Sequence, residues 1–204
     1  MDEPIPRAVL CDLDGVLRHF AADQFSSLDA ANGLPPGTVA SVAFAPERLV
    51  PAITGVVTDE QWRSGVAAAL AAACGSADRS RALVRAWSAS SGSIDAEVLD
   101  LLTRARARVP VVLVTNATSR LDTDLAALGI ADAFDGVLNS SRLGAAKPDP
   151  RVYRAAAALA GVPVGRCLFL DDAPRNVRAA HAAGMPAVLF RRPDDLRRAL
   201  GPLL

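Results

Sequence analysis

The sequence lacks the features that mark disulfide-rich, zinc-binding and membrane-spanning proteins. Its three cysteines, Cys11, Cys74 and Cys167, form no CxxC pair, so neither a disulfide framework nor a zinc site is indicated. The longest apolar stretch, residues 66–74, is too short to cross a bilayer, and the first residues show no signal-peptide pattern. We therefore expect a cytoplasmic protein that does not act at a membrane.

The sequence also lacks an excess of either charge. Lysine and arginine together number 22 among the 204 residues, as do aspartate and glutamate. This balance gives no electrostatic reason to bind nucleic acid or an anionic membrane. The phosphate-loop pattern GxxxxGK[ST] is absent as well, so phosphate binding of that kind is excluded.

What the sequence does contain is a series of short apolar runs. Strands are predicted at residues 8–11, 111–115, 136–139, 167–170 and 187–190. Unbroken apolar runs are typical of parallel strands buried on both faces, and beyond residue 92 they alternate with helical patterns. The fold class is therefore α/β, with a doubly wound, Rossmann-like parallel sheet. Thr118 is expected to cap the helix that follows it.

The segment of residues 17–91 has a different character. It shows no strand pattern and contains alanine-rich helical stretches at residues 59–74 and 78–88. It is too long for an ordinary connection, and its aliphatic content favours folded helices over a disordered loop. We predict a core of residues 1–16 and 92–204, with a small α-helical domain of residues 17–91 inserted into it.

Two carboxylates follow the first predicted strand. Asp12 and Asp14 stand on alternate positions and are followed by Gly15, so the two side chains could share one side of the chain. A dehydrated carboxylate pair needs a compensating charge, and a divalent cation is the obvious one. An ordinary polar exit from a strand, with a turn glycine, is the alternative explanation.

Three further polar groups stand at or near predicted strand ends: Thr115-Asn116, Lys147 and Asp171-Asp172. Taken singly, the first could cap a helix, the second could be a solvated loop lysine, and the third could be an acidic helix N-terminus. In a doubly wound sheet, however, the ligand crevice lies beyond the carboxyl ends of the strands. The acids and Thr115, which stand at such ends, could therefore meet in one site.

These four motifs, in this order, resemble those of the haloacid dehalogenase-like (HAD) superfamily, and of subfamily IA with a helical cap between the first two motifs. The fourth motif reads Asp171-Asp172-Ala-Pro-Arg-Asn176, with asparagine where a second acid often stands. In this it resembles the branch containing the N-terminal phosphatase domain of epoxide hydrolases and the sugar-phosphate phosphatases. By this resemblance, residues 17–91 are the cap.

The resemblance also implies catalytic roles. Asp12 would be the nucleophile, and Asp14 the acid that protonates the leaving oxygen and then the base that activates water. Thr115 and Lys147 would hold the phosphoryl oxygens, assisted by the backbone of Asn116.

The implied cofactor is Mg²⁺, a hard cation that prefers oxygen ligands. Its protein ligands would be Asp12, the carbonyl of Asp14, and Asp172. Asp171 and Asn176 would support the site, and the pattern leaves open whether Asp171 or Asp172 contacts the metal directly.

The implied function is that of a magnesium-dependent phosphatase that hydrolyses a small phosphorylated metabolite through an aspartyl-phosphate, as a monomer or homodimer. The alternatives are a phosphomutase or haloacid dehalogenase of the same superfamily, or a non-catalytic phosphate-binding relative. Asp14 argues against a dehalogenase, which lacks the second acid of the first motif. Specificity is expected from the cap and from the residues after Gly15, with Arg18, His19 and Phe20 as candidates. Trp62 is a further candidate, although tryptophans in helices more often serve packing.

Overall fold

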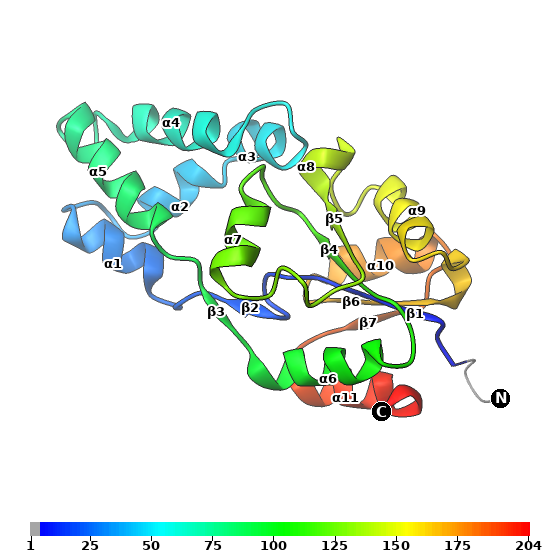
Figure 1. Cartoon of the computed structure of the whole chain (residues 1–204). Helices are drawn as coiled ribbons and strands as arrows, with labels where there is room; N and C mark the ends of the chain where they lie inside the picture. The colour runs from blue at the N-terminus through cyan, green and yellow to red at the C-terminus, as the bar shows by residue number, and fades with distance from the viewer. Residues whose placement is uncertain (1–4) are drawn as a thin grey trace.

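The computed structural model describes residues 5–204, so residues 1–4 of the predicted core lie outside it. Its main sheet has five parallel strands in the order β5-β4-β1-β6-β7 (Figure 1). The strands are β1 (Ala8–Cys11), β4 (Val111–Thr115), β5 (Gly136–Asn139), β6 (Cys167–Asp171) and β7 (Ala187–Leu189). Central strand β1 pairs with β4 and with β6, so that Val9 lies opposite Val111 on one side and Leu168 on the other. The predicted α/β parallel sheet is confirmed.

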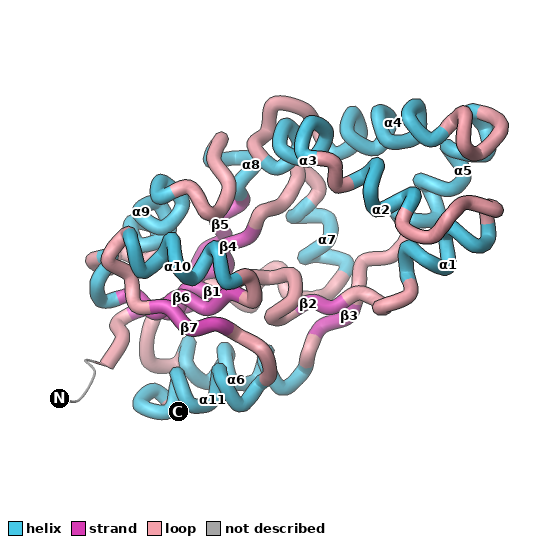
Figure 2. The backbone as a smooth tube through the Cα atoms, turned by 180° about the vertical axis from the view of Figure 1, so that it is seen from behind, coloured by secondary structure: helices cyan, strands magenta, loops and turns pink. Residues whose placement is uncertain are grey.

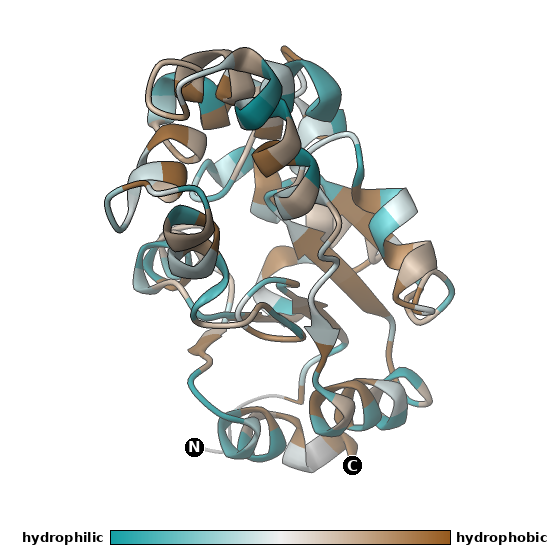
Figure 3. Cartoon of the chain, turned by 90° about the vertical axis from the view of Figure 1, so that its left-hand side faces the viewer, coloured by the Kyte–Doolittle hydropathy of each residue, from teal (hydrophilic) through white to brown (hydrophobic). Residues whose placement is uncertain are grey.

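Helices cover both faces of this sheet. One face packs against α6 (Ala96–Arg106), α7 (Leu121–Ala127) and α11 (Pro193–Leu200), and the other against α9 (Pro150–Leu159) and α10 (Pro174–Ala182). Shorter helical segments are α8 (Ser140–Leu143), Val164–Arg166 and Gly201–Leu203. Alternate residues of β1 supply the two layers, because Val9 and Cys11 belong to the first core cluster and Ala8 and Leu10 to the second. Strands β1, β4 and β6 are thus buried along their whole length, and Figure 3 shows the hydrophobic colour of the sheet.

The segment between β1 and α6 forms helices that lie to one side of the sheet (Figure 1). These are α1 (Gln24–Ala31), α2 (Thr38–Ala43), α3 (Pro46–Ile53), α4 (Asp59–Leu70) and α5 (Ala77–Ser88). They share a hydrophobic cluster of their own, which includes Trp62 and Trp87. Helix α4 begins at a capping box, in which Thr58 and Gln61 each satisfy the other's backbone N–H.

Two short strands connect these helices to the core. Strands β2 (Arg18–His19) and β3 (Ser93–Ile94) pair antiparallel with each other, and Figure 2 shows them between the two parts of the chain. The chain therefore enters the helical segment and leaves it at the same place. Within residues 5–204, no helix has the length and apolar character needed to cross a membrane.

Candidate active site

The site residues come from the carboxyl ends of three adjacent strands. Asp12 directly follows β1, Thr115 ends β4, and Asp171 ends β6, with Asp172 next along the chain. Lys147 reaches the same edge from the loop before α9. Because β4, β1 and β6 are neighbours in register, residues far apart in sequence meet here. Thr115 is buried at the end of its strand.

Lys147 lies between two carboxylates. Its Nζ is 2.7 Å from Oδ1 of Asp12 and 2.7 Å from Oδ2 of Asp171. The same Oδ1 of Asp12 accepts the N–H of Leu13 at 2.7 Å. Both contacts use Oδ1, so Oδ2 is the Asp12 oxygen available to a ligand.

Asp171 is engaged on both of its oxygens. Its Oδ1 accepts the N–H of Ala173 at 2.8 Å and the amide of Asn176 at 2.9 Å, and its Oδ2 accepts Lys147. These contacts fix the carboxylate as an anchor for the lysine. Asp172 is exposed, which leaves its oxygens more accessible than those of Asp171.

The charges of this cluster do not balance. Burial raises the pKa of the Asp12 carboxyl to about 7; the Lys147 ammonium opposes the rise and Asp171 adds to it. Burial alone would lower the pKa of Lys147, but Asp12 and Asp171 outweigh it and the net shift is upward. Burial, and then Asp171, raise the pKa of Asp172. Three carboxylates therefore face one ammonium, and the site is short of positive charge.

The donor set fits a hard divalent cation. Oxygens of Asp12, Asp171 and Asp172 lie within 4.8 Å of one another. Carboxylate oxygens are the ligands that magnesium prefers, and an added cation would offset the excess negative charge. Since the oxygens of Asp171 are already engaged, Asp12 and Asp172 are the better placed to hold it.

Gly15 lies directly against this cluster. It has a φ of +83°, and a Cβ added there would lie 2.1 Å from Oδ2 of Asp172. Only glycine adopts this left-handed conformation without cost and also leaves room for the carboxylate. Gly15 of the first motif therefore leaves the space that Asp172 of the fourth motif occupies. The sequence alone did not indicate this contact.

Asp14 is held by an arginine. Nε and Nη2 of Arg18 donate to its two carboxylate oxygens at 2.6 and 3.0 Å. The same guanidinium reaches Asp124 of α7 at 3.3 Å. Sequence reasoning had named Arg18 only as a specificity candidate, because nothing in the local pattern indicates the contact with α7.

Asn116 is engaged through its side chain. Its Oδ1 accepts the N–H of Lys147 at 2.7 Å, and its Nδ2 donates to the carbonyl of Lys147 at 2.9 Å. This reciprocal pair fixes the backbone from which the lysine extends. From the sequence, only the backbone of Asn116 was expected to assist in the site. The role of its side chain in positioning the backbone of Lys147 was not predicted.

The expectation that Thr118 caps a helix was wrong. Helix α7 begins at Leu121, and its N-cap residue is Arg120, with no side-chain cap. The Thr118 hydroxyl instead donates to Oδ1 of Asp59 on α4, at 2.7 Å. A hydrogen bond to a charged acceptor is stronger than one to a neutral acceptor. This bond joins the core to the inserted helices.

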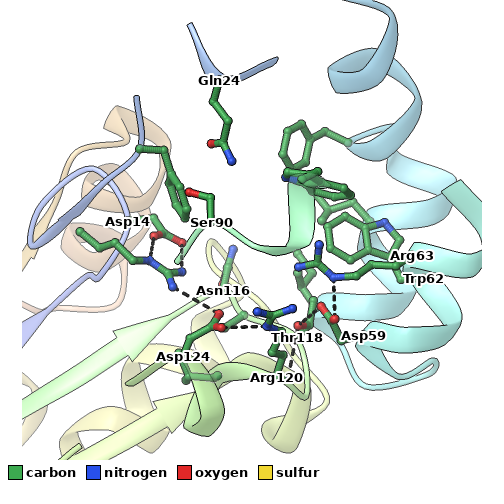
Figure 4. Close-up of a pocket in the computed structure, with 18 of the residues that line it drawn as sticks. Asp14, Gln24, Asp59, Trp62, Arg63, Ser90, Asn116, Thr118, Arg120 and Asp124 are labelled. Carbon is green, nitrogen blue, oxygen red and sulfur yellow. Dashed lines mark hydrogen bonds and ion pairs between the residues drawn. The ribbon is translucent and has the colours of Figure 1, made fainter. Parts of the chain in front are cut away.

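A cavity of about 390 Å³ lies between the inserted helices and the core (Figure 4). Asp14, Asn116 and Thr118 line its core side. Of the specificity candidates, Arg18, Phe20 and Trp62 also line it, whereas His19 does not. The cavity thus adjoins the proposed acid of the first motif.

The parallel sheet and the lysine-bridged carboxylates at its edge define an α/β enzyme with a site of the kind that holds a hard metal ion. A family model for haloacid dehalogenase-like hydrolases matches residues 6–184, and the chain belongs to this family. The family predicted from the four motifs is thereby confirmed.

Similar proteins include phosphatases and a dehalogenase. Phosphatase MT3486 of Mycobacterium tuberculosis is 48% identical over 66 residues, which are 32% of this chain and 30% of that protein. The first curated relatives are matched over only 9% to 36% of their own length.

Two solved structures share the fold. A HAD family enzyme of Bacteroides thetaiotaomicron, in complex with magnesium and inorganic phosphate, has a TM-score of 0.72 at 20% identity, covering 91% of this chain and 94% of that one. The 2-haloacid dehalogenase of Pseudomonas syringae pv. Tomato DC3000 has a TM-score of 0.68 at 20% identity, covering 98% and 100%. At this identity the likeness concerns the fold alone.

Proposed function

We propose that the protein is a magnesium-dependent phosphatase that hydrolyses a small phosphorylated metabolite through an aspartyl-phosphate on Asp12. The observation that carries the proposal is the position of Asp14, which lines the cavity while Asp12 lies beside Lys147. A halide leaves carbon as an anion without a proton, whereas an alkoxide leaving phosphorus needs one. A second carboxyl at the cavity therefore favours a phosphatase over a dehalogenase.

In the first step, Oδ2 of Asp12 would attack phosphorus and the bond from phosphorus to the leaving oxygen would break. Asp14, in its protonated form, would exchange its contacts with Arg18 for the leaving oxygen and give that oxygen its proton. In the second step, Asp14 would take a proton from water as the water attacks phosphorus, which releases Asp12. Thr115 and the Lys147 ammonium would hold phosphoryl oxygens throughout.

Asp12, the carbonyl of Asp14, and Asp172 would hold magnesium, with Asp171 and Asn176 as supporting residues. When bound, the ion would neutralise charge on the phosphoryl oxygens, over which the transition state of phosphoryl transfer spreads it. The relative from Bacteroides thetaiotaomicron, which binds magnesium and phosphate, supports this part of the proposal. Residues 17–91 would act as the cap that encloses the substrate.

Phosphate release from a panel of phosphate esters tests the proposal. Magnesium should be required, chelation should abolish turnover, and Asp12→Asn should remove it because no nucleophile remains. Asp14→Asn should slow an alkyl phosphate by about 10²- to 10⁴-fold and an activated aryl phosphate less, since a good leaving group needs little protonation. Undiminished turnover by a folded Asp12→Asn protein would overturn the mechanism, and equal losses on both esters would remove Asp14 from the acid's role.

A further inference from the structure

The cavity beside Asp14 has an aromatic wall (Figure 4). Five aromatic side chains line it: Phe20, Phe25, Phe44, Trp62 and Trp87. They account for most of the aromatic residues in the chain, which has six phenylalanines, two tryptophans and one tyrosine. A leaving group in this cavity would therefore meet aromatic carbon along one wall.

All of these rings except that of Phe20 form one connected cluster. Trp62 and Trp87 lie 5.2 Å apart between ring centroids, and Phe44 lies 6.2 Å from Trp87, both pairs edge to face. The indole N–H of Trp62 donates to the carbonyl of Ala43 and is not available to a ligand. Phe44 and Phe20 remain 44% and 41% exposed, although rings of this size are usually buried. These two rings are the most exposed aromatic side chains of the cavity lining.

The charged side chains on the cap side of the cavity neutralise each other. Arg63 donates to Asp59 at 2.6 Å and to Ser88 at 2.6 Å, and its guanidinium lies over the ring of Trp87, 4.5 Å from the centroid. This arginine is thus paired with a carboxylate and stacked on an aromatic ring. It is not poised to bind a second anionic group.

The arginines on the core side are paired as well. Arg120 donates to Asp124 at 2.8 Å, and Arg18 contacts both Asp14 and Asp124. If Asp14 turned to a substrate, Arg18 would still contact Asp124, which it would share with Arg120. Among the described residues that line the cavity, every cation therefore has a carboxylate partner.

On the proposed function, on which this inference rests, Asp14 gives its proton to the leaving oxygen, so the leaving group extends into this cavity. We propose that the substrate is a phosphate monoester whose leaving alcohol carries a flat, uncharged, apolar group, and that esters bearing a carboxylate are excluded. A ring buried among aromatic side chains gains hydrophobic and aromatic contact. A carboxylate placed there would lose its hydration without gaining a cation. The volume, about 390 Å³, lies near the lower end for ligand pockets, about 300–1,000 Å³, and suits one or two rings.

Three esters with similar alkyl leaving oxygens separate recognition from leaving-group chemistry: 2-phenylethyl, propyl and 2-carboxyethyl phosphate. We expect kcat/KM for the phenyl ester to exceed that for the propyl ester by about tenfold, and that for the carboxylate ester by about a hundredfold. Equal values for the phenyl and propyl esters, or a preference for the carboxylate ester, would overturn the inference. The proposed function would still stand in that case, because phosphate is released.

Two variants of cavity residues and one control test which side chains are responsible. Phe44→Ala should reduce kcat/KM for the phenyl ester by about 3- to 10-fold, and should reduce kcat/KM for the propyl ester by less. Val50→Ala is the matched control, since Val50 is 49% exposed on the same group of helices and does not line the cavity. The amide of Gln24 points into the cavity (Figure 4). Gln24→Lys should therefore raise kcat/KM for the carboxylate ester, relative to that for the phenyl ester, by about tenfold. Equal changes in Phe44→Ala and Val50→Ala would refute the role of the open ring.

Binding can be measured without turnover. The two tryptophans of the chain, Trp62 and Trp87, both line the cavity, so their fluorescence reports its occupancy. With magnesium present, 3-phenylpropylphosphonate, in which carbon replaces the ester oxygen, should quench it at lower concentration than 3-carboxypropylphosphonate. Tight phenyl binding without release of phosphate from any ester would contradict the phosphatase function and leave the cavity's preference intact. Equal binding of the two phosphonates would overturn the preference itself.

Discussion

Replacing Gly15 with alanine tests whether Asp172 is held against the turn after β1. An added Cβ would lie 2.1 Å from Oδ2 of Asp172, far inside the van der Waals separation of about 3.5–4.0 Å, so this carboxylate must move. Misplaced ligands and their supporting groups weaken metal sites by about 10- to 100-fold. We therefore expect the magnesium concentration for half-maximal phosphate release to rise by about that factor.

A control variant separates the backbone cost of this change from its effect on Asp172. Gly129 has a φ of +69°, close to the +83° of Gly15, but an added Cβ there would meet no atom within 4 Å. Gly15→Ala and Gly129→Ala should each lose about 1–2 kcal/mol of unfolding free energy in urea, because both force alanine into the left-handed region. Only Gly15→Ala should change the magnesium requirement. The same requirement in both variants would refute the assignment of Asp172 as a ligand.

Three further changes probe other contacts. Asn116→Ala removes two hydrogen bonds to the backbone of Lys147, so unfolding free energy should fall by about 1–3 kcal/mol and kcat should fall with it; an unchanged kcat would contradict the positioning role. Asp59→Ala removes the acceptor of the Thr118 hydroxyl, and urea unfolding should show a loss of about 1–3 kcal/mol; unaltered stability would mean that this contact is weak. Burial alone would raise the pKa of Asp135, but hydrogen bonds from a strand N–H and from an arginine outweigh burial, and the net pKa is lowered. The contribution of Asp135 to stability is therefore present at neutral pH and is lost as the pH falls below about 4. Asp135→Asn should therefore reduce the fall of the melting temperature on acidification, and an identical fall in both proteins would exclude this contribution.

The sheet and the cluster at its edge could be predicted because their signals are local. A short apolar run that ends in a polar residue indicates both a buried strand and the residue at its carboxyl end, as for Val111–Thr115 and Cys167–Asp171. Parallel pairing then places these ends together without further information. Even so, the sequence did not indicate which carboxylates Lys147 would contact, and one of them is Asp171.

Contacts between the inserted helices and the core were not predictable, because they depend on docking between segments with no shared periodicity. The hydrogen bond from Thr118 to Asp59 joins residues 59 positions apart, and the contact from Arg18 to Asp124 joins residues 106 positions apart. Neither pair has a spacing that distinguishes it from ordinary surface polar residues. The aromatic wall was not predictable for the same reason. Trp62 and Trp87 have the sequence pattern of residues that pack between helices, and they do pack there, but they also line the cavity.

The pairing of β2 with β3 limits how the helical segment can move. Two separate flexible tethers would allow it to translate and to turn in any direction, but the outgoing and returning strands are hydrogen-bonded side by side. The two ends of the helical segment therefore cannot be displaced independently of each other. Arg18 belongs to this two-stranded ribbon and holds Asp14, which means that a displacement of the ribbon acts directly on a carboxyl group that lines the cavity.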